Sequence, residues 1–437
     1  MSALANILKR KGLRVSGSDR KEKFFTDAIL KKCRINFFEG FNENNLKSFN
    51  PDLIVYSSAY KEDNPEIKLA KKMNFPLLSY AEVLGLLFKE KFGIAICGSH
   101  GKTTTAALVG QILEEGQLDP TVLVGSRVRK WQNNNRFGHS PYLVAEVDEY
   151  QNKLRHYNPK IAILTNIDFD HPDFFRTPEE YKQAFFDFIK KLPPDGLLIA
   201  WAEDPIIEKH LKKFYQCRVV TFGFKKGLWQ AKLLKDNYWE FWQNKKKMGV
   251  FKLNLIGRHN VLNNLAAFIC GYELGVKSPV MRKVLANFKG TTRRLELKGI
   301  VNGIKVIDDY AHHPTEIQAT LKALKDFYFK KRVFCLFQPH TFTRTEVLFK
   351  DFARSFQDVG QTIILDIYGS AREKSGRVSS ENLARTASKY SQVKYLADKN
   401  QILDFLRENL KKGDILLTMG AGDVWKLGEE FLELAKK

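Results

Sequence analysis

The sequence predicts an α/β protein with mostly parallel sheets, divided into three domains. Short β-rich runs alternate with helical segments along almost the whole chain, which is the pattern of repeated βαβ units. At 437 residues the chain is too long for one compact core. A charged connector at 88–91 and a Gly-Thr-Thr hinge at 290–292 separate three blocks, so we expect domains at 1–88, 89–290 and 291–437.

The first domain has two predicted strands, at 13–16 and 52–56, but the sequence opens on a helix. A doubly wound nucleotide-binding domain starts with a strand and a glycine turn, and we expect both to be missing here. The first predicted strand leads into Ser16-Gly17-Ser18-Asp19. Its acidic residue could meet a ribose hydroxyl.

The second domain begins with an apolar strand at 92–97, a glycine loop and a helical pattern at 106–115. The loop is Gly98-Ser99-His100-Gly101-Lys102-Thr103-Thr104-Thr105. Its backbone N–H groups can face phosphate oxygens, Lys102 can reach the outer phosphates, and Thr103 can offer its hydroxyl to Mg²⁺. The standard loop would have a glycine where Ile96 stands. The pattern predicts an ATP or GTP site, and the alternative is a glycine-rich turn with a solvated lysine.

Polar residues follow two further strands of this domain. Glu146 comes after the strand at 142–145, and Asp168, Asp170 and His171 come after the strand at 161–164. Ligands bind beyond the carboxyl ends of strands in parallel sheets, so Glu146 and His171 are placed to hold a divalent metal beside the phosphates. Alternatively, Glu146 caps a turn and His171 is a surface histidine.

The third domain repeats this arrangement. The strand at 304–307 leads to Asp309, Tyr310, His312 and His313, and the strand at 333–337 leads to Arg344; further strands are expected at 362–365 and 415–418. Paired histidines and an arginine suit a carboxylate or phosphate partner, although the histidines could be structural. Trp425 stands where a dinucleotide fingerprint would have its third glycine, which argues against NAD.

Composition excludes several classes of protein. The formal charge is +22, but the lysines are scattered and no basic helix or RNA motif is present, so we expect no nucleic-acid partner. The five cysteines are spaced without a C-x-x-C pair, which predicts reduced thiols and no zinc site. No apolar run approaches the roughly 20 residues that cross a bilayer, and no signal peptide is evident. We expect a cytoplasmic protein without stable membrane insertion.

Longer motifs resemble the Mur ligases of peptidoglycan synthesis, over the whole chain. The family's G-[TS]-H-G-K-T-T, E-A-D-E, T-N-I-x-x-D-H-x-D, G-R-H-N-x-x-N, R-R and D-D-Y-[GA]-H-H-P-T-E are similar to residues 98–104, 146–149, 165–173, 257–263, 293–294 and 308–316. Two more motifs, F-Q-P-H-x-x-T-R-T and M-G-A-G-D, distinguish the alanine-adding branch and resemble 337–345 and 419–423.

The resemblance implies a Rossmann-like UDP-binding domain, a central P-loop ATPase domain and a C-terminal Rossmann-like domain that closes on both. It implies an ATP-dependent ligase that joins the lactyl carboxylate of UDP-N-acetylmuramate to L-alanine through an acyl phosphate, with Mg²⁺, as a monomer or homodimer. A carboxylate needs such activation because it is a poor electrophile.

The resemblance also implies roles for individual residues. Lys102 and the loop, Gly98 to Thr104, would hold the ATP phosphates; Thr103 would bind one Mg²⁺, and Glu146 and His171 a second. The remaining implied contacts are adenine at Asn260 and Asn263, a phosphate at Arg294, ribose at Asp309, alanine and the lactyl group at Tyr310, His312 and Arg344, and UDP at Ser16, Asp19, Ser57 and Ser58. His171 and His312 are candidates for the base.

Some features depart from the family or leave alternatives open. Thr341 and Tyr80 stand where members often have arginine. Since the family's first strand and its glycine loop are absent, we expect weak UDP-sugar binding and a start at an internal methionine of a longer gene product; an in-frame stop codon directly before Met1 would contradict this. The alternatives are a recycling ligase that adds a tripeptide, or a nucleotide-binding homologue that has lost activity. A generic kinase or ATPase would leave the third domain unexplained.

Overall fold

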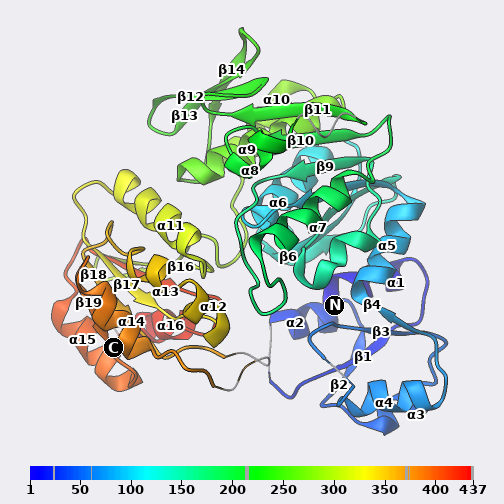
Figure 1. Ribbon diagram of the computed structural model, residues 1–437, viewed down its shortest axis with the longest axis horizontal. Coiled ribbons are helices and arrows are strands. Elements are labelled where there is room, and N and C mark those ends of the chain that lie inside the picture. The colour runs from blue at the N-terminus through cyan, green and yellow to red at the C-terminus, as the bar shows by residue number, and fades with distance from the viewer. Residues whose placement is uncertain (23–24, 61, 212–215, 370–372, 374, 435–437) are drawn as a thin grey trace.

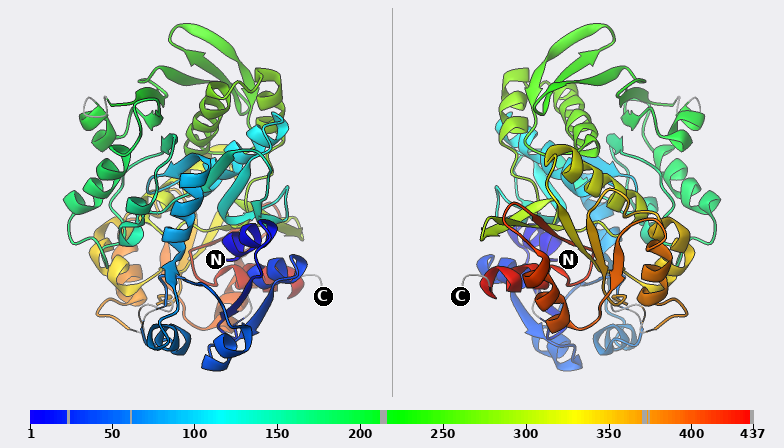
Figure 2. Two further views of the ribbon diagram at one scale, coloured as in Figure 1. Left: turned by 90° about the vertical axis from the view of Figure 1, so that its right-hand side faces the viewer. Right: turned by 90° about the vertical axis from the view of Figure 1, so that its left-hand side faces the viewer.

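The computed structural model describes residues 1–22, 25–60, 62–211, 216–369, 373 and 375–434 (Figure 1). Each sheet takes its strands from one continuous stretch of the chain. Residues 1–90, here the N-terminal part, lie at one lower corner of Figure 1, and residues 291–434, the C-terminal part, lie at the other. The two side views of Figure 2 also place both at the end of the molecule opposite the β12–β14 extension of the central part, residues 91–290.

The N-terminal part contains two separate two-stranded parallel sheets, β1–β2 and β3–β4. Its elements are α1 (Ser2–Arg10), β1 (Ser16–Asp19), α2 (Phe25–Lys32), β2 (Asn36–Glu39), α3 (Glu43–Phe49), β3 (Ile54–Tyr56), α4 (Pro65–Lys72), β4 (Leu77–Ser79) and α5 (Tyr80–Glu90).

The position predicted for the first strand is wrong. Residues 13–15 are not part of β1, because its ladder with β2 begins at the pair Ser16 and Asn36 and runs to Asp19 and Glu39. Leu13 is 54% exposed and contributes nothing to a core. Ser16 and Asp19 therefore lie within the strand rather than beyond its end.

The central part holds a ten-stranded sheet of order β14-β13-β12-β11-β10-β9-β5-β8-β6-β7. The strands from β12 to β6 in this order pair in parallel, while β12–β13–β14 and β6–β7 pair antiparallel. The bounds are β5 (Phe92–Cys97), α6 (Lys102–Glu115), β6 (Thr121–Val128), β7 (Asn133–Arg136), β8 (Tyr142–Glu146), the 3-10 helix η1 (Tyr150–His156), β9 (Ile161–Leu164), α7 (Pro178–Ile189), β10 (Leu197–Trp201), α8 (Pro205–His210), β11 (Arg218–Gly223), β12 (Trp229–Lys235), β13 (Tyr238–Gln243), β14 (Lys246–Lys252), α9 (Arg258–Glu273) and α10 (Ser278–Asn287).

Two cores cover the two faces of this sheet. Because successive side chains of a strand point to opposite faces, Ile94 and Ile96 of β5 pack with α6, α9 and α10, while Ala95 and Cys97 pack with α1, α5 and α7. α1 thus docks on the central part through Ala3, Leu4 and Ile7. The sheet is held rigidly from both sides, which fixes the loops at the carboxyl ends of its strands.

The C-terminal part is a six-stranded sheet of order β15-β16-β20-β17-β18-β19, parallel except for β15. Its elements are β15 (Glu296–Val301), β16 (Ile304–Asp309), α11 (Pro314–Phe327), β17 (Val333–Phe337), α12 (Phe342–Val347), α13 (Phe349–Ala353), β18 (Gln361–Ile364), α14 (Ser380–Ala387), β19 (Val393–Tyr395), α15 (Lys399–Asn409), β20 (Ile415–Met419) and α16 (Trp425–Leu434). The α/β class with mostly parallel sheets is confirmed.

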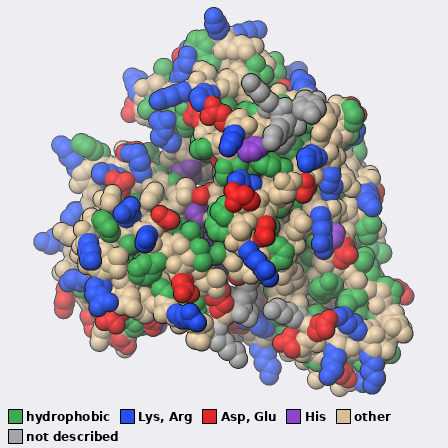
Figure 3. Space-filling view, viewed as in Figure 1, with side chains coloured by type: hydrophobic (Ala, Val, Ile, Leu, Met, Phe, Trp, Pro, Cys, Tyr) green, Lys and Arg blue, Asp and Glu red, His purple; other side chains and the backbone are tan. Residues whose placement is uncertain are grey.

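The structure agrees with two expectations from composition, which are scattered basic side chains and free cysteine thiols. Lys and Arg side chains are scattered over the face shown in Figure 3 rather than gathered in one patch. Four of the five cysteines are buried, and all five are free thiols. No helix within the described ranges combines the length and the apolar character that spanning a membrane requires.

Candidate active site

The glycine loop joins β5 to α6 and leaves the first turn of that helix open to an anion. Gly98 and Gly101 have φ values of +125° and +83°, which favour glycine. A Cβ at Gly98 would come within 2.1 Å of Thr165 Oγ1, so the close approach also excludes a side chain. Gly101 is the N-cap residue directly before α6, and no described side chain caps the N–H groups of the first turn. N–H groups of this kind at a helix N-terminus suit an anion such as a phosphate.

Lys102 is folded over this loop and is held as a cation. Its Nζ donates to Ser99 O at 2.9 Å and to Glu149 Oε2 at 3.2 Å. Burial lowers the pKa of Lys102, but the carboxylates of Glu149, Glu146 and Asp148 outweigh burial and raise it above its ordinary value. A positive charge is therefore fixed at the loop, as phosphoryl transfer requires.

The structure brings together Thr103 and Glu146, two of the residues expected to bind metal. Thr103 Oγ1 donates to Glu146 Oε1 at 2.9 Å, and Gly125 N donates to Glu146 Oε2 at 2.7 Å. A hydroxyl and a carboxylate side by side are the oxygen ligands that Mg²⁺ prefers. An ion that took these ligands would replace the hydrogen bond between them.

His171 lies against other carboxylates of the same site. Its Nε2 is 3.7 Å from Glu149 Oε1 and 3.9 Å from Asp170 Oδ2, and its Nδ1 is buried with no hydrogen-bond partner among the residues that the structure describes. The backbone of His171 has φ +57°, an uncommon conformation for a residue with a side chain. A buried imidazole nitrogen without a partner fits a metal ligand.

Two asparagines of α9 lie beside the glycine loop. Thr105 Oγ1 of α6 donates to Asn263 Oδ1 at 3.2 Å, and Asn263 Nδ2 donates to Asn260 Oδ1 at 3.2 Å. Both asparagines are 7% exposed, and a Cβ on Gly101 would come within 2.5 Å of Asn263 Oδ1. The structure thus brings the expected adenine contacts next to the phosphate loop.

The C-terminal part contributes Arg294, Asp309 and Tyr310. Asp309 Oδ2 accepts from Leu295 N at 2.7 Å and its Oδ1 from Ala311 N at 2.9 Å; burial raises the pKa of Asp309 to about 6. The guanidinium of Arg294 lies 5.3 Å from the centre of the Tyr310 ring. Asp309 ends β16, so its carboxylate marks the carboxyl edge of this second sheet.

His312 is held as a neutral imidazole. Its Nδ1 lies 3.0 Å from Tyr310 O and 3.3 Å from Glu316 Oε2. Burial lowers the pKa of His312 to about 4, so the ring is uncharged at neutral pH. It can exchange hydrogen bonds with an amine, although a pKa of about 4 makes it a weak base.

Arg344 has a partner that sequence reasoning did not find. Its Nε donates to Asp170 Oδ1 at 2.8 Å, and these side chains are 5% and 8% exposed. Arg344 belongs to α12 of the C-terminal part and Asp170 to the loop after β9 of the central part. The sequence shows Asp170 only as a residue that follows a strand, and nothing near it predicts a contact with an arginine 174 positions away.

The residues expected at UDP lie apart from this cluster, in the N-terminal part. Ser16 Oγ donates to Asn36 O at 3.2 Å, Tyr60 OH donates to Asp19 Oδ1 at 2.7 Å, and Ala59 N donates to Ser57 Oγ at 3.3 Å. Ser57 and Ser58 follow β3 directly. These contacts are all made within residues 1–60.

Two further carboxylates were missed although they end quoted motifs. Glu149 binds Lys102 and also accepts from Tyr181 OH at 2.8 Å. Glu316 accepts from His312 N at 3.2 Å and lies 3.4 Å from Arg294 Nη1. The sequence signal that could have identified them is their position in the motifs, because Glu149 ends the motif at 146–149 and Glu316 ends the motif at 308–316.

Three family models match consecutive stretches of the chain. They are "Mur ligase family, catalytic domain" over residues 1–92, "Mur ligase middle domain" over 96–271 and "Mur ligase, glutamate ligase domain" over 293–422.

Curated relatives match at full length. A UDP-N-acetylmuramate--L-alanine ligase of Caldanaerobacter subterraneus subsp. tengcongensis is 40% identical over 446 residues, which covers 100% of this chain and 96% of the relative. A protein of the same name from Clostridium novyi is 41% identical over 439 residues and covers 99% and 95%.

Solved structures share the fold. The UDP-N-acetylmuramate-alanine ligase MurC of Thermotoga maritima gives a TM-score of 0.82 at 27% identity over 100% of this chain and 96% of that chain. A murein peptide ligase of Psychrobacter arcticus gives 0.75 at 24% identity, with the same coverage of 100% and 96%, and at that identity the likeness concerns the fold alone.

Proposed function

The chain belongs to the Mur ligase family, and from that premise we propose that it joins L-alanine to the lactyl carboxylate of UDP-N-acetylmuramate at the expense of ATP. The enzyme is an ATP-dependent ligase of peptidoglycan precursor synthesis. The observation that supports this most is that two clusters are linked: Lys102, Thr103 and Glu146 at the glycine loop, and His312 and Arg344 from the C-terminal part, where Arg344 pairs with Asp170 of the central part. The first suits a phosphoryl donor and the second an amino acid.

The reaction needs two steps because a carboxylate resists attack by an amine. One carboxylate oxygen attacks the γ-phosphorus of ATP and ADP leaves, giving an acyl phosphate. The amine of L-alanine then attacks the carbonyl carbon, phosphate leaves, and the amine loses a proton. Lys102 and the N–H groups at the start of α6 stabilise charge on the moving phosphoryl group, and this charge stabilisation needs no rearrangement of the site.

Divalent metal fits the same site. Thr103 and Glu146 offer paired oxygens, and His171 offers a buried nitrogen without a partner among the described residues. Thr103 would hold one Mg²⁺, and Glu146 and His171 would hold a second. When bound, the metal would screen the repulsion between the substrate carboxylate and the phosphates. The roles of Asn260 and Asn263 at adenine, Arg294 at a phosphate, Asp309 at ribose, and Ser16, Asp19, Ser57 and Ser58 at UDP belong to this proposal.

Glu146→Gln is expected to lower kcat by about 10² to 10³-fold, because an amide holds a divalent cation far less well than a carboxylate. Raising the Mg²⁺ concentration should recover part of the loss. The measurement is phosphate release at several Mg²⁺ concentrations. Glu179→Gln is the matched control, since Glu179 is 74% exposed and pairs with Lys182 on the surface. Equal kcat values for the two variants would remove Glu146 from the metal site.

The acceptor distinguishes the proposed reaction from its nearest alternative. Phosphate release from ATP and UDP-N-acetylmuramate is measured with L-alanine, glycine, L-serine or the recycled tripeptide as acceptor. We expect the highest kcat/KM with L-alanine, because the motifs at 337–345 and 419–423 are those of the alanine-adding branch. Turnover with the tripeptide alone would identify a recycling ligase, and ATP binding without acceptor-dependent turnover would identify a homologue that has lost activity.

A further inference from the structure

His100 lies at the middle of the phosphate loop, and its side chain contacts both the central part and the C-terminal part. Its Nε2 is 2.9 Å from Asp168 Oδ2 in the central part, and its Nδ1 is 3.3 Å from Glu316 Oε1 in the first turn of α11 in the C-terminal part. The side chain of His100 is 14% exposed, and that of Glu316 is 10% exposed. A ring whose two nitrogens each face a carboxylate can satisfy both when it carries two protons.

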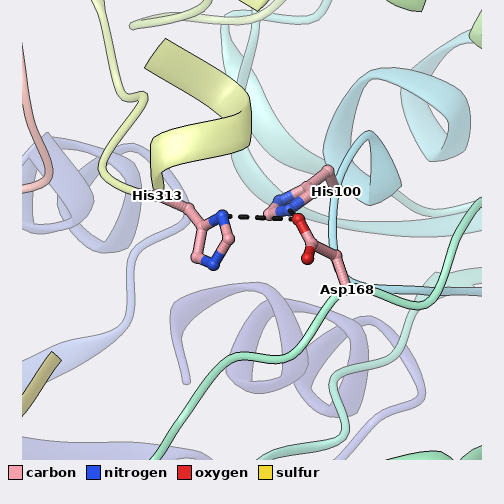
Figure 4. A group of neighbouring side chains, drawn as sticks. All are labelled: His100, Asp168 and His313. Atoms are coloured by element: carbon pink, nitrogen blue, oxygen red, sulfur yellow. Dashed lines mark hydrogen bonds and ion pairs between the residues drawn. The ribbon is translucent and has the colours of Figure 1, made fainter. Parts of the chain in front are cut away.

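A second histidine closes the same junction from the other side. His313, which precedes α11, has Nε2 at 3.1 Å from Phe169 O and Nδ1 at 3.4 Å from Asp168 Oδ2. Figure 4 shows the side chains of His100 and His313 both directed toward the Asp168 carboxylate. Asp168 therefore touches one histidine from each part of the molecule.

We propose that His100, as an imidazolium, is the positioning residue that couples the phosphate loop to closure of the C-terminal part, by bridging Asp168 and Glu316. Closure then adds a contact to the loop that holds the nucleotide, and a bound nucleotide, by ordering the loop, favours closure. The inference rests on the ATP-binding half of the proposed function. It does not depend on which amine is ligated.

The backbone of His100 is fixed by other groups, which frees the side chain for this role. His100 N donates to Asn166 Oδ1 at 2.8 Å, and His100 O accepts from Thr165 Oγ1 at 2.6 Å. A substitution at His100 therefore removes the bridge and leaves the loop's own hydrogen bonds in place.

The surroundings favour the charged ring. Burial lowers the pKa of His100, but the hydrogen bonds and charges of Asp168 and Glu316 outweigh burial and raise it to about 9. The other titratable and charged groups of the junction are His313, His312, His259 and Arg294; burial keeps the first three neutral by lowering their pKa values. The two carboxylates that flank His100, Asp168 and Glu316, then lie near two cations, His100 and Arg294.

The pH dependence follows from the direction of this shift. The pKa of about 9 lies above the ordinary histidine value of about 6.5. The bridge therefore contributes fully below about pH 6.5 and is lost as pH rises through about 9. In an open form, His100 would lack Glu316 and hold its proton less tightly, so closure is expected to weaken in alkaline solution.

A metal ion is the competing occupant of this junction. One ligand atom from each of His100, Asp168 and His313 lies within 4.8 Å of the others. Such an ion would need a neutral His100 and would leave an excess positive charge beside Arg294. The balance of charges therefore favours the proton over the metal, and metal binding becomes an outcome that the experiment can detect.

The test measures ATP affinity by calorimetry at pH 7.5 and pH 10, with Mg²⁺ but without alanine or UDP-sugar, in the full chain and in His100→Gln, Glu316→Gln and the double variant. His100→Gln should weaken binding about tenfold at pH 7.5, and Glu316→Gln at least as much, because its carboxylate also lies against Arg294. The double variant should bind no more weakly than Glu316→Gln, since both substitutions remove the same bridge. The full chain should lose a similar factor between the two pH values, and His100→Gln should not. His139→Gln is the control, because His139 is exposed and far along the chain from the loop.

Small-angle scattering and Zn²⁺ binding give two further readouts. Small-angle scattering with ATP and Mg²⁺ should show a larger radius of gyration for His100→Gln than for the full chain, while the melting temperature confirms that the variant folds. Additive losses in the double variant, or an unchanged pH dependence in His100→Gln, would overturn the bridge. So would stoichiometric Zn²⁺ binding at pH 7.5 that His100→Gln and His313→Gln abolish. Ligase activity is measured separately, so its absence would contradict the proposed function and leave the bridge standing.

Discussion

Lys102→Met is expected to lower kcat by about 10³-fold while the protein stays folded. Methionine keeps the length of the side chain but removes the charge at the phosphate loop, and the loss of one preformed stabilising group of this kind costs about 3 to 4 kcal/mol in the transition state. Glu149 loses its Lys102 partner but keeps the hydrogen bond from Tyr181, which limits the damage to the fold. Phosphate release with saturating substrates gives kcat, and the melting temperature reports folding.

The control for this variant is Lys190→Met, because Lys190 is 60% exposed and pairs only loosely with Asp187 at 3.7 Å. Its kcat should equal that of the unmodified chain. If Lys102→Met retained kcat within tenfold of Lys190→Met, the loop lysine would not stabilise the moving phosphoryl group. The proposed phosphoryl transfer at this loop would then need a different cation.

Arg344→Ala is expected to have a double effect, on alanine use and on stability. The kcat/KM for L-alanine should fall by about 10² to 10³-fold, because a charge-assisted contact to the amino-acid carboxylate is removed. The melting temperature should also fall, since Asp170 is left buried without its cation, an arrangement that costs about 3 to 5 kcal/mol. Steady-state kinetics with varied L-alanine and a thermal melt measure the two effects.

Asp170→Asn separates these effects. It breaks the same ion pair but leaves the guanidinium of Arg344 in place, so it should weaken stability while preserving far more of the kcat/KM for L-alanine than Arg344→Ala does. Equal losses of kcat/KM in the two variants would mean that Arg344 only holds the C-terminal part against the central part. An exposed pair, Arg407 and Asp404, supplies the matched control, and Arg407→Ala should change neither quantity.

Much of the fold and part of the site could be predicted because the signals are local. An apolar run, a glycine loop and a helix locate β5 and α6, and the strands at 142–145, 161–164, 304–307, 333–337 and 415–418 were all found within two residues of their observed bounds. The rule that ligands bind at the carboxyl edge of parallel sheets located Glu146 near Thr103, because Glu146 ends β8, Thr103 follows β5, and these strands are neighbours.

The features that the sequence did not predict depend on contacts between distant segments of the chain. Arg344 was expected to contact a substrate carboxylate, and nothing in the sequence indicated that its guanidinium also binds Asp170 in the loop after β9 of the central part. His100 was read only as part of a phosphate loop, and its link to Glu316 arises where α11 packs over that loop. The position of β1 was missed for a similar reason, since a strand is defined by its partner and β2 begins its pairing at Ser16.

One signal in the sequence was present but not used. Asp236 and Asn237 separate β12 from β13, and both have positive φ values, 48° and 60°, as a tight hairpin turn requires. An Asp-Asn pair between two apolar stretches predicts such a hairpin. The antiparallel extension formed by β12, β13 and β14 could therefore have been inferred, whereas the ion pairs between the sheets could not.

The central claim, activation of a carboxylate by phosphoryl transfer, is tested most directly with oxygen isotopes. UDP-N-acetylmuramate labelled with ¹⁸O in both oxygens of its lactyl carboxylate is turned over with ATP, Mg²⁺ and L-alanine, and the released phosphate is analysed by mass spectrometry. We predict one ¹⁸O atom in each phosphate and the other in the new amide, because the attacking carboxylate oxygen leaves with the phosphoryl group. Phosphate that carries no ¹⁸O from the labelled substrate would contradict the account. If that phosphate takes up ¹⁸O when the reaction is run in ¹⁸O-labelled water, the chain hydrolyses ATP without transferring phosphate to the carboxylate.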